Sequence, residues 1–182
     1  MKGLLILANG FEDSEALTTL DCLRRSGLAL DMCSIFNEAK VTSSHNVSVL
    51  VDVMYKDIDL NDYDFLVVPG GPAVYNLLHE STEVTDIIKH FHAKDEYIFS
   101  ICAAPSLLSK LGLFDNEKYT CFPGCDIKDA KGNNTGESVV VSGKFVSARS
   151  MYYSADFALA IIELLQGKDT RVRIENSIKG LN

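Results

Sequence analysis

No basic stripe runs through this sequence of 182 residues. Lysine and arginine number 17 against 25 aspartates and glutamates, which gives a formal net charge of -8. Binding to a nucleic-acid backbone needs clustered cations that neutralise a run of phosphates, and no such cluster is present. We therefore expect no nucleic-acid partner, and the acidic excess indicates solubility more than a specific function.

The sequence also lacks a long apolar segment near its start and a regular cysteine framework. The first apolar run, residues 3–8, is too short for a membrane span or for the core of a signal peptide. The five cysteines are odd in number and irregularly spaced, which is typical of a reducing compartment. These features predict a cytoplasmic protein with no membrane partner.

Repeats, linkers and low-complexity stretches are absent as well, so we expect one domain over residues 1–182. Short apolar runs instead alternate with amphipathic stretches. One such stretch places Val84, Ile87, Ile88 and Phe91 at the spacing of a core-facing helix stripe. The expected strands are 3–8, 28–36, 63–68 and 97–101, with an exposed strand pair in 41–53 and a hairpin of 139–141 with 145–147. The expected helices are 14–26, one around 84–91, one from 103, 157–165 and 169–178.

This alternation predicts an α/β protein with a mostly parallel sheet between two helix layers. Ligands of such folds bind at the carboxyl ends of the strands. Here those ends carry residues 9–15, the pair Gly70-Gly71, and Cys102. The glycine pair lacks the lysine and the spacing of a P-loop, so it indicates close backbone approach to a reacting oxygen.

Cys102 is the most informative residue, because it lies where an apolar strand turns sharply into a helix that carries Pro105 in its first turn. The positive end of that helix is expected to lower the thiol pKa and to favour a nucleophile or a redox-active sulfur. An unpaired cysteine is more often a small buried apolar residue, and this reading suits Cys22, Cys33 and Cys121. Cys121 and Cys125 together supply only two thiols, too few for a tetrahedral zinc site.

Four motifs follow one another along the chain: Gly10-Phe11-Glu12-Asp13-Ser14-Glu15-Ala16, Val68-Pro69-Gly70-Gly71-Pro72, Ser100-Ile101-Cys102-Ala103-Ala104-Pro105 and Phe157-Ala158-Leu159-Ala160-Ile161-Ile162. In this order and at these intervals they resemble the ThiJ/PfpI superfamily and in particular its parkinsonism-associated (deglycase or glyoxalase) branch. The resemblance implies a flavodoxin-like three-layer α/β/α sandwich of the class I glutamine amidotransferase type, a nucleophile elbow, a homodimer and no cofactor.

The same resemblance assigns roles to residues of this chain. Cys102 would be the nucleophile, Glu15 the acid against its sulfur, and the amides of Gly71 and Ala103 the oxyanion site. A carboxyl group buried beside a thiolate has a raised pKa and can shuttle protons near neutral pH. The residues alone leave another interpretation of Glu15 open, an ordinary first-turn acid.

The resemblance also points to two basic residues near the site. His45 stands where relatives carry a basic residue close to the partner's active site, and Arg149 follows the last hairpin. We expect this pair to attract an anion. The other histidines favour surface or structural roles: His79 is expected at the surface, and His90 and His92 diverge on a helix, so no metal site is predicted.

Two positions depart from related patterns. Some relatives place a histidine near the cysteine where this chain has Phe122, and the intracellular-protease branch has one where this chain has Ala103. A Cys-His dyad is therefore not supplied, which argues against peptidase or amidotransferase chemistry.

The sequence leads to two functional hypotheses that use the same residues. The first is a cofactor-independent enzyme of the glyoxalase III or deglycase type, in which the Cys102 thiolate attacks a small aldehyde or dicarbonyl and Glu15 moves the proton. The second is a non-catalytic redox sensor or stress chaperone in which Cys102 is oxidised and Glu15 stabilises the product. The superfamily's thiazole-biosynthesis label finds no separate support in the residues.

Overall fold

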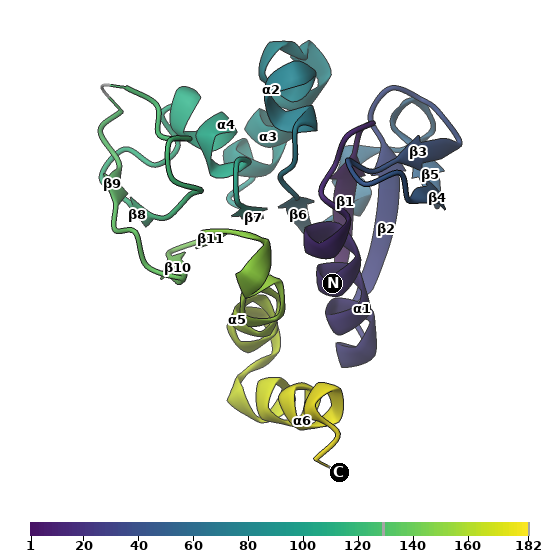
Figure 1. Ribbon diagram of the computed structural model, residues 1–182, viewed down its shortest axis with the longest axis vertical. Helices are drawn as coiled ribbons and strands as arrows, with labels where there is room; N and C mark the ends of the chain where they lie inside the picture. The colour runs from purple at the N-terminus through teal and green to yellow at the C-terminus, as the bar shows by residue number, and fades with distance from the viewer. Residues whose placement is uncertain (129, 182) are drawn as a thin grey trace.

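The computed structural model describes residues 1–128 and 130–181, whose centre is a seven-stranded sheet in the order β10-β11-β7-β6-β1-β2-β5 (Figure 1). All neighbouring pairs in this sheet are parallel except β10 with β11. Its strands are β1 (Lys2–Leu7), β2 (Ala29–Ser34), β5 (Val53–Met54), β6 (Phe65–Val68), β7 (Tyr97–Ile101), β10 (Val139–Ser142) and β11 (Phe145–Ala148).

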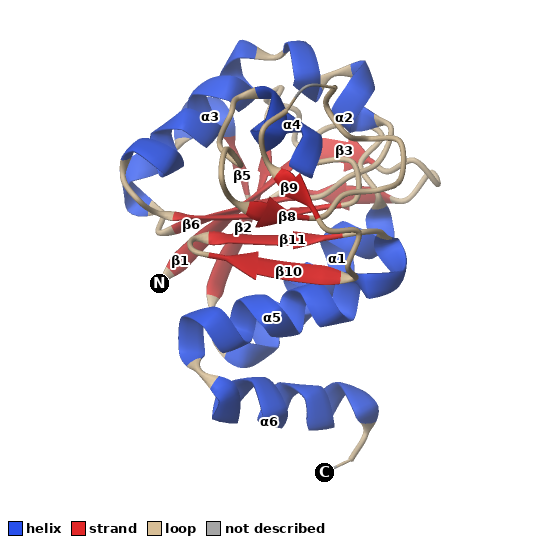
Figure 2. Cartoon of the chain, turned by 90° about the vertical axis from the view of Figure 1, so that its left-hand side faces the viewer, coloured by secondary structure: helices blue, strands red, loops and turns tan. Residues whose placement is uncertain are grey.

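Helices cover both faces of this sheet (Figure 2). The helices α2 (Ala73–Asn76), α3 (Thr82–Ala93) and α4 (Pro105–Lys110) pack on one face, and α1 (Asp13–Ser26) and α5 (Ser154–Gln166) on the other, with α6 (Lys168–Lys179) beyond them. Alternate residues of β1 enter the two apolar cores, Leu4 and Ile6 on the α3 side, Leu5 and Leu7 on the α5 side. The expected three-layer, flavodoxin-like sandwich is confirmed.

The helix boundaries follow from local signals that the sequence carries. The Glu12 side chain accepts a hydrogen bond from the Ser14 N–H at the start of α1, and Gly27 ends that helix with a left-handed φ of 94°. Ser81 caps α3 by accepting from the Val84 N–H at 3.2 Å. The four apolar residues of the expected α3 stripe are all buried.

One expectation about strands needs adjustment, and one further pair of strands lies outside the main sheet. The exposed pair expected in 41–53 is the hairpin of β3 (Lys40–Thr42) and β4 (Ser48–Leu50), but β5 leaves it and joins the main sheet as an edge strand beside β2. The β-prone segment around Cys121 forms only the short β8 (Lys118–Tyr119), which pairs with β9 (Asn133–Asn134). The hairpin expected near 139–147 is confirmed as β10 with β11.

Four short 3-10 helices complete the described secondary structure, at Tyr55–Asp57, Leu60–Asp62, Leu78–Glu80 and Met151–Tyr153. Within the described ranges, every helix is too short or too polar to cross a membrane.

Candidate functional site

Cys102 occupies the sharp turn between β7 and α4, with a φ of 64°. A residue other than glycine rarely adopts this left-handed conformation, so the surrounding structure must hold it. Two backbone hydrogen bonds of 2.8 Å do so: the Cys102 N–H donates to the Ala148 carbonyl, and the Cys102 carbonyl accepts from the Phe122 N–H. The thiol is half-buried at the carboxyl end of the sheet.

The Pro69-Gly70-Gly71 turn after β6 packs between this elbow and the Glu15 side chain. A Cβ atom at Gly70 would lie 2.7 Å from Glu15 Oε2, 2.8 Å from Cys102 Cβ and 3.1 Å from the Ala103 nitrogen. Only a residue without a side chain fits there. The acid, the thiol-bearing residue and the first amide of the helix turn therefore converge on one backbone position.

Gly71 is required at its position for a different reason. Its φ is +97°, and a Cβ atom on it would lie 2.5 Å from the Glu12 nitrogen and 2.6 Å from the Gly10 carbonyl oxygen. The glycine lets the turn after β6 pack directly against the backbone that leads into α1. Among the described residues no oxygen is in position to accept from the Gly71 N–H, so this amide is free for a ligand.

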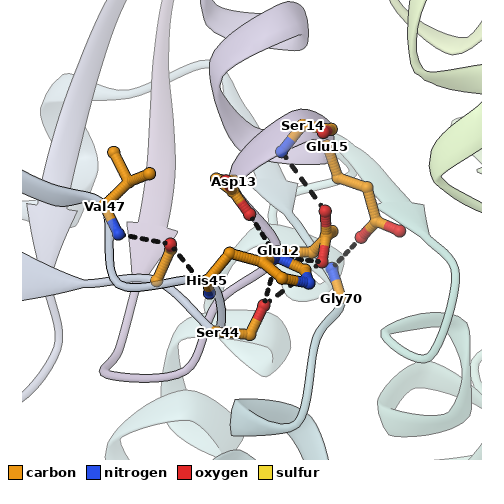
Figure 3. A network of polar contacts seen from close by, with 9 residues as sticks. Glu12, Asp13, Ser14, Glu15, Ser44, His45, Val47 and Gly70 are labelled. Atoms are coloured by element: carbon orange, nitrogen blue, oxygen red, sulfur yellow. Dashed lines mark hydrogen bonds and ion pairs between the residues drawn. The ribbon is translucent and has the colours of Figure 1, made fainter.

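Glu15 projects from the first turn of α1 into the protein and is only 1% exposed. Its Oε2 accepts a 2.7 Å hydrogen bond from the Gly70 N–H, while Oε1 is buried with no hydrogen-bond partner among the described residues (Figure 3). Burial raises the pKa of Glu15 to about 7, against the opposing effect of the nearby Cys102 thiol and of the hydrogen bond from the Gly70 N–H. Capping of α1 is done by Glu12, so Glu15 is not an ordinary first-turn acid.

The prediction that the helix lowers the thiol pKa of Cys102 was wrong. Burial raises the pKa of this thiol, the charge of the nearby Glu15 raises it further, and the Ala103 N–H only partly opposes them. The helix α4 is a single short segment of six residues that starts three positions after the cysteine, which limits its effect. Because the same two groups perturb each other, their protons titrate as a pair. A protonated Glu15 removes the repulsion and can donate to a thiolate.

His45 lies in the loop between β3 and β4 and faces acidic neighbours (Figure 3). Its Nδ1 is 2.9 Å from Asp13 Oδ1 and 3.6 Å from Glu12 Oε2, and the contact with Asp13 raises the pKa of His45. These two carboxylates offset a charge on the imidazole, which argues against anion attraction by His45 within one chain. Arg149 is half-buried, and its guanidinium donates to the Gly136 carbonyl at 3.3 Å.

Glu12, Asp13 and His45 are also the one group in the described part of the chain that could offer three ligand atoms to a metal ion. Their contacts with one another and with the Ser44 hydroxyl already satisfy them, so nothing in the geometry requires a cation.

His79, which was expected at the surface, is partly exposed, but its imidazole also has a partner inside the protein. Burial lowers the pKa of the imidazole, and its Nε2 lies 2.8 Å from the Ser106 hydroxyl on α4. Ser106 in turn donates to the Ala103 carbonyl at 2.6 Å, so His79 supports the turn that carries Cys102. The residue was missed because its partner is distant in sequence and no local pattern signals the pairing.

Comparisons with known proteins identify the family of this chain. A model of the DJ-1/PfpI family matches residues 1–164. The chain belongs to the DJ-1/PfpI family. It is 31% identical to protein dj-1beta of Drosophila melanogaster over 184 residues, which cover 99% of this chain and 96% of that protein. It is also 31% identical to a deglycase of Thermococcus kodakarensis, over 82% of this chain and 90% of that one.

Solved structures of this family share the fold. A DJ-1 of Toxoplasma gondii, described as oxidized, superposes with a TM-score of 0.88 at 29% identity, covering 97% of both chains. The family and the fold expected from the four motifs are therefore confirmed, whereas the roles assigned to individual residues stay predictions.

Proposed function

We propose that this member of the DJ-1/PfpI family is a cysteine-dependent enzyme that needs no cofactor and acts on small reactive dicarbonyls, as a glyoxalase III or deglycase does. One observation supports this most directly: Glu15 is buried against the Cys102 elbow with a pKa of about 7. A carboxyl group with this pKa accepts and returns a proton at neutral pH. The similarity to a protein named a deglycase points in the same direction.

With methylglyoxal as the substrate, the steps are as follows. The Cys102 thiolate attacks the aldehyde carbon, and the carbonyl oxygen takes up a proton to give a hemithioacetal. Glu15 removes the proton from that carbon and returns it to the neighbouring carbon, while the hydroxyl proton passes to the neighbouring oxygen through an enediol, which leaves a thioester of the hydroxy acid. Water cleaves the thioester, releases lactate and restores the thiol.

Backbone amides would stabilise the charge that develops on oxygen in this sequence. The Ala103 nitrogen lies 3.1 Å from the Cβ position of Gly70 at which Glu15 and Cys102 also meet, and Gly71 is the next residue of the same turn. Such preorganised donors act most strongly in a site from which water is excluded. The half-buried thiol and the nearly inaccessible Glu15 meet that condition.

A glutathione-free assay of methylglyoxal conversion to lactate tests the proposal. We expect Cys102→Ser to abolish turnover and Glu15→Gln to lower kcat by roughly 10²–10⁴-fold, because the amide keeps a hydrogen bond but cannot shuttle a proton. Cys125→Ser, which removes another half-buried thiol, should keep wild-type turnover. Equal and negligible rates in the wild type and Cys102→Ser would contradict the proposal.

That last outcome would favour the redox hypothesis, for which the structure offers one specific argument. Oε1 of Glu15 is buried without a hydrogen-bond partner in the described part of the chain, so in the protonated acid it can donate to an oxygen atom added to the Cys102 sulfur. A relative described as oxidized is consistent with oxidation at such a site. Peptide mass spectrometry after mild peroxide treatment should then find Cys102 modified before the other four cysteines.

A further inference from the structure

A tight turn at residues 122–125 lies directly against the backbone of the Cys102 elbow. The Phe122 N–H donates to the Cys102 carbonyl at 2.8 Å, and the Cys125 N–H donates to the Phe122 carbonyl at 2.9 Å. Gly124, at the third position of this turn, has a φ of 85°, and Pro123 precedes it. This pattern is that of a type II turn, whose first and last Cα atoms lie less than about 7 Å apart. The turn therefore carries Cys125 back toward the elbow.

The pKa shifts of two neighbouring residues agree with this position of Cys125. The Cys102 thiol has a pKa raised by burial, then by Glu15, and to a smaller extent by the charge of Cys125. The pKa of Tyr75 on α2 is raised by burial and then by the nearby Cys125 thiol. The turn at residues 122–125, whose Phe122 N–H donates to the Cys102 carbonyl, therefore provides the structural link between Cys125 and the elbow.

Cys102 and Cys125 are more exposed to solvent than the other three cysteines. All five cysteines lie in the described part of the chain, and only Cys102 and Cys125 are partly exposed. Cys22, Cys33 and Cys121 are each 2% exposed or less. The Cys121 thiol also donates to Asp126 Oδ1 at 3.3 Å. A hydroperoxide can therefore reach Cys102 while a second accessible thiol stands on the adjoining turn.

We propose that Cys125 is the resolving thiol of Cys102 in a reversible oxidation by hydroperoxides. The Cys102 thiolate attacks the peroxide, the S–O bond forms as the O–O bond breaks, and the sulfur gives up two electrons to become a sulfenic acid. The Cys125 thiolate then attacks that sulfur, the S–S bond forms, and the S–O bond breaks with release of water after proton uptake. A dithiol reductant restores both thiols.

This disulfide would have two consequences for the elbow. It occupies the Cys102 sulfur, so it prevents both attack on a carbonyl and further oxidation to the irreversible sulfinic acid. It also joins two segments that the Phe122–Cys102 hydrogen bond already holds together, and the exposed turn can adjust to the geometry a disulfide requires.

Hydrogen peroxide in a few-fold molar excess, followed by mass spectrometry without reductant, tests the proposal. Before alkylation the wild-type chain should be about 2 Da lighter, by the mass of two hydrogens, and after alkylation and digestion it should yield a peptide pair that links Cys102 to the 119–128 tryptic peptide. Dithiothreitol should reverse the loss. Cys125→Ser should form no such pair and should instead gain about 32 Da at Cys102, the mass of a sulfinic acid.

Cys121→Ser is the matched control, because Cys121 lies on the same tryptic peptide as Cys125. This variant should form the disulfide as the wild type does. A disulfide that involves Cys121, a disulfide between two chains, or a wild type that reaches the sulfinic acid as fast as Cys125→Ser would overturn the proposal. Methylglyoxal turnover of reduced Cys125→Ser is a separate readout, so failure of the resolving role is distinguishable from failure of the proposed enzyme activity.

Discussion

Replacement of Glu15 by glutamine should change how the stability of this protein depends on pH. The pKa of the buried carboxyl group is raised from 4.5 to about 7 in the folded chain. Between these two values the folded state binds a proton that the unfolded state has lost, so the free energy of unfolding falls as the pH rises. The contribution of the neutral acid is fully present below pH 4.5 and is lost above about pH 7.

The size of the effect follows from the two values. They differ by about 2.5, and each pH unit corresponds to about 1.4 kcal/mol, so Glu15 should cost the wild type about 3 kcal/mol of stability between acid and neutral pH. Glu15→Gln cannot ionise and should lack this loss. Its amide also keeps a group able to occupy the site beside the Gly70 N–H.

Denaturant unfolding at several pH values from 4.5 to 8, for the wild type and Glu15→Gln, measures this contribution as the difference between two stability profiles. Titrating groups that do not interact with Glu15 are common to both proteins and cancel in that difference. Glu137→Gln, which removes an exposed carboxyl group, serves as the control and should follow the wild-type profile. Parallel profiles for the wild type and Glu15→Gln would refute the buried, neutral state assigned to Glu15.

Three further predictions concern the backbone, the assembly and the chemistry. Gly71→Ala should lower the free energy of unfolding by more than about 2 kcal/mol, because its Cβ would overlap the Gly10 and Glu12 backbone. Gly124→Ala has open space around it and should cost only about 1–2 kcal/mol. Equal losses in denaturant unfolding would contradict the packing argument. Sedimentation at micromolar concentration should find a symmetric homodimer, to which exposed Leu50 would contribute, and a monomer would exclude it. Unfolded casein should not be cleaved, since Phe122 and Ala103 stand where other branches carry a histidine; cleavage that disappears in Cys102→Ser would contradict this.

The sequence predicted the elements of this fold well because each carries its own local signal. The apolar run of β1, the stripe of α3 and the glycine after α1 are periodic or conformational features that need no knowledge of distant residues. The departure of β5 from its hairpin was not predictable, since the neighbour that β5 finds in β2 is a property of the whole sheet.

The features of the candidate site also differ in whether the sequence predicts them. Cys102 was identifiable from the strand-to-helix context, and its pairing with Glu15 came from the family resemblance. The direction of the thiol pKa was predicted wrongly, because burial and a nearby carboxyl group, both consequences of tertiary packing, outweigh a local helix. The contact of His79 with Ser106 also joins distant segments, so no sequence pattern could have revealed it.

The two hydrogen bonds that hold Cys102 in its left-handed conformation have a consequence for the assembly of the protein. Both partners, Phe122 and Ala148, follow Cys102 in the sequence, and Ala148 is the last residue of β11. During synthesis the nascent chain therefore emerges with Cys102 well before the groups that shape its turn. The reactive geometry can form only when β11 has joined the sheet, so a partly synthesised or truncated chain carries this thiol without the site.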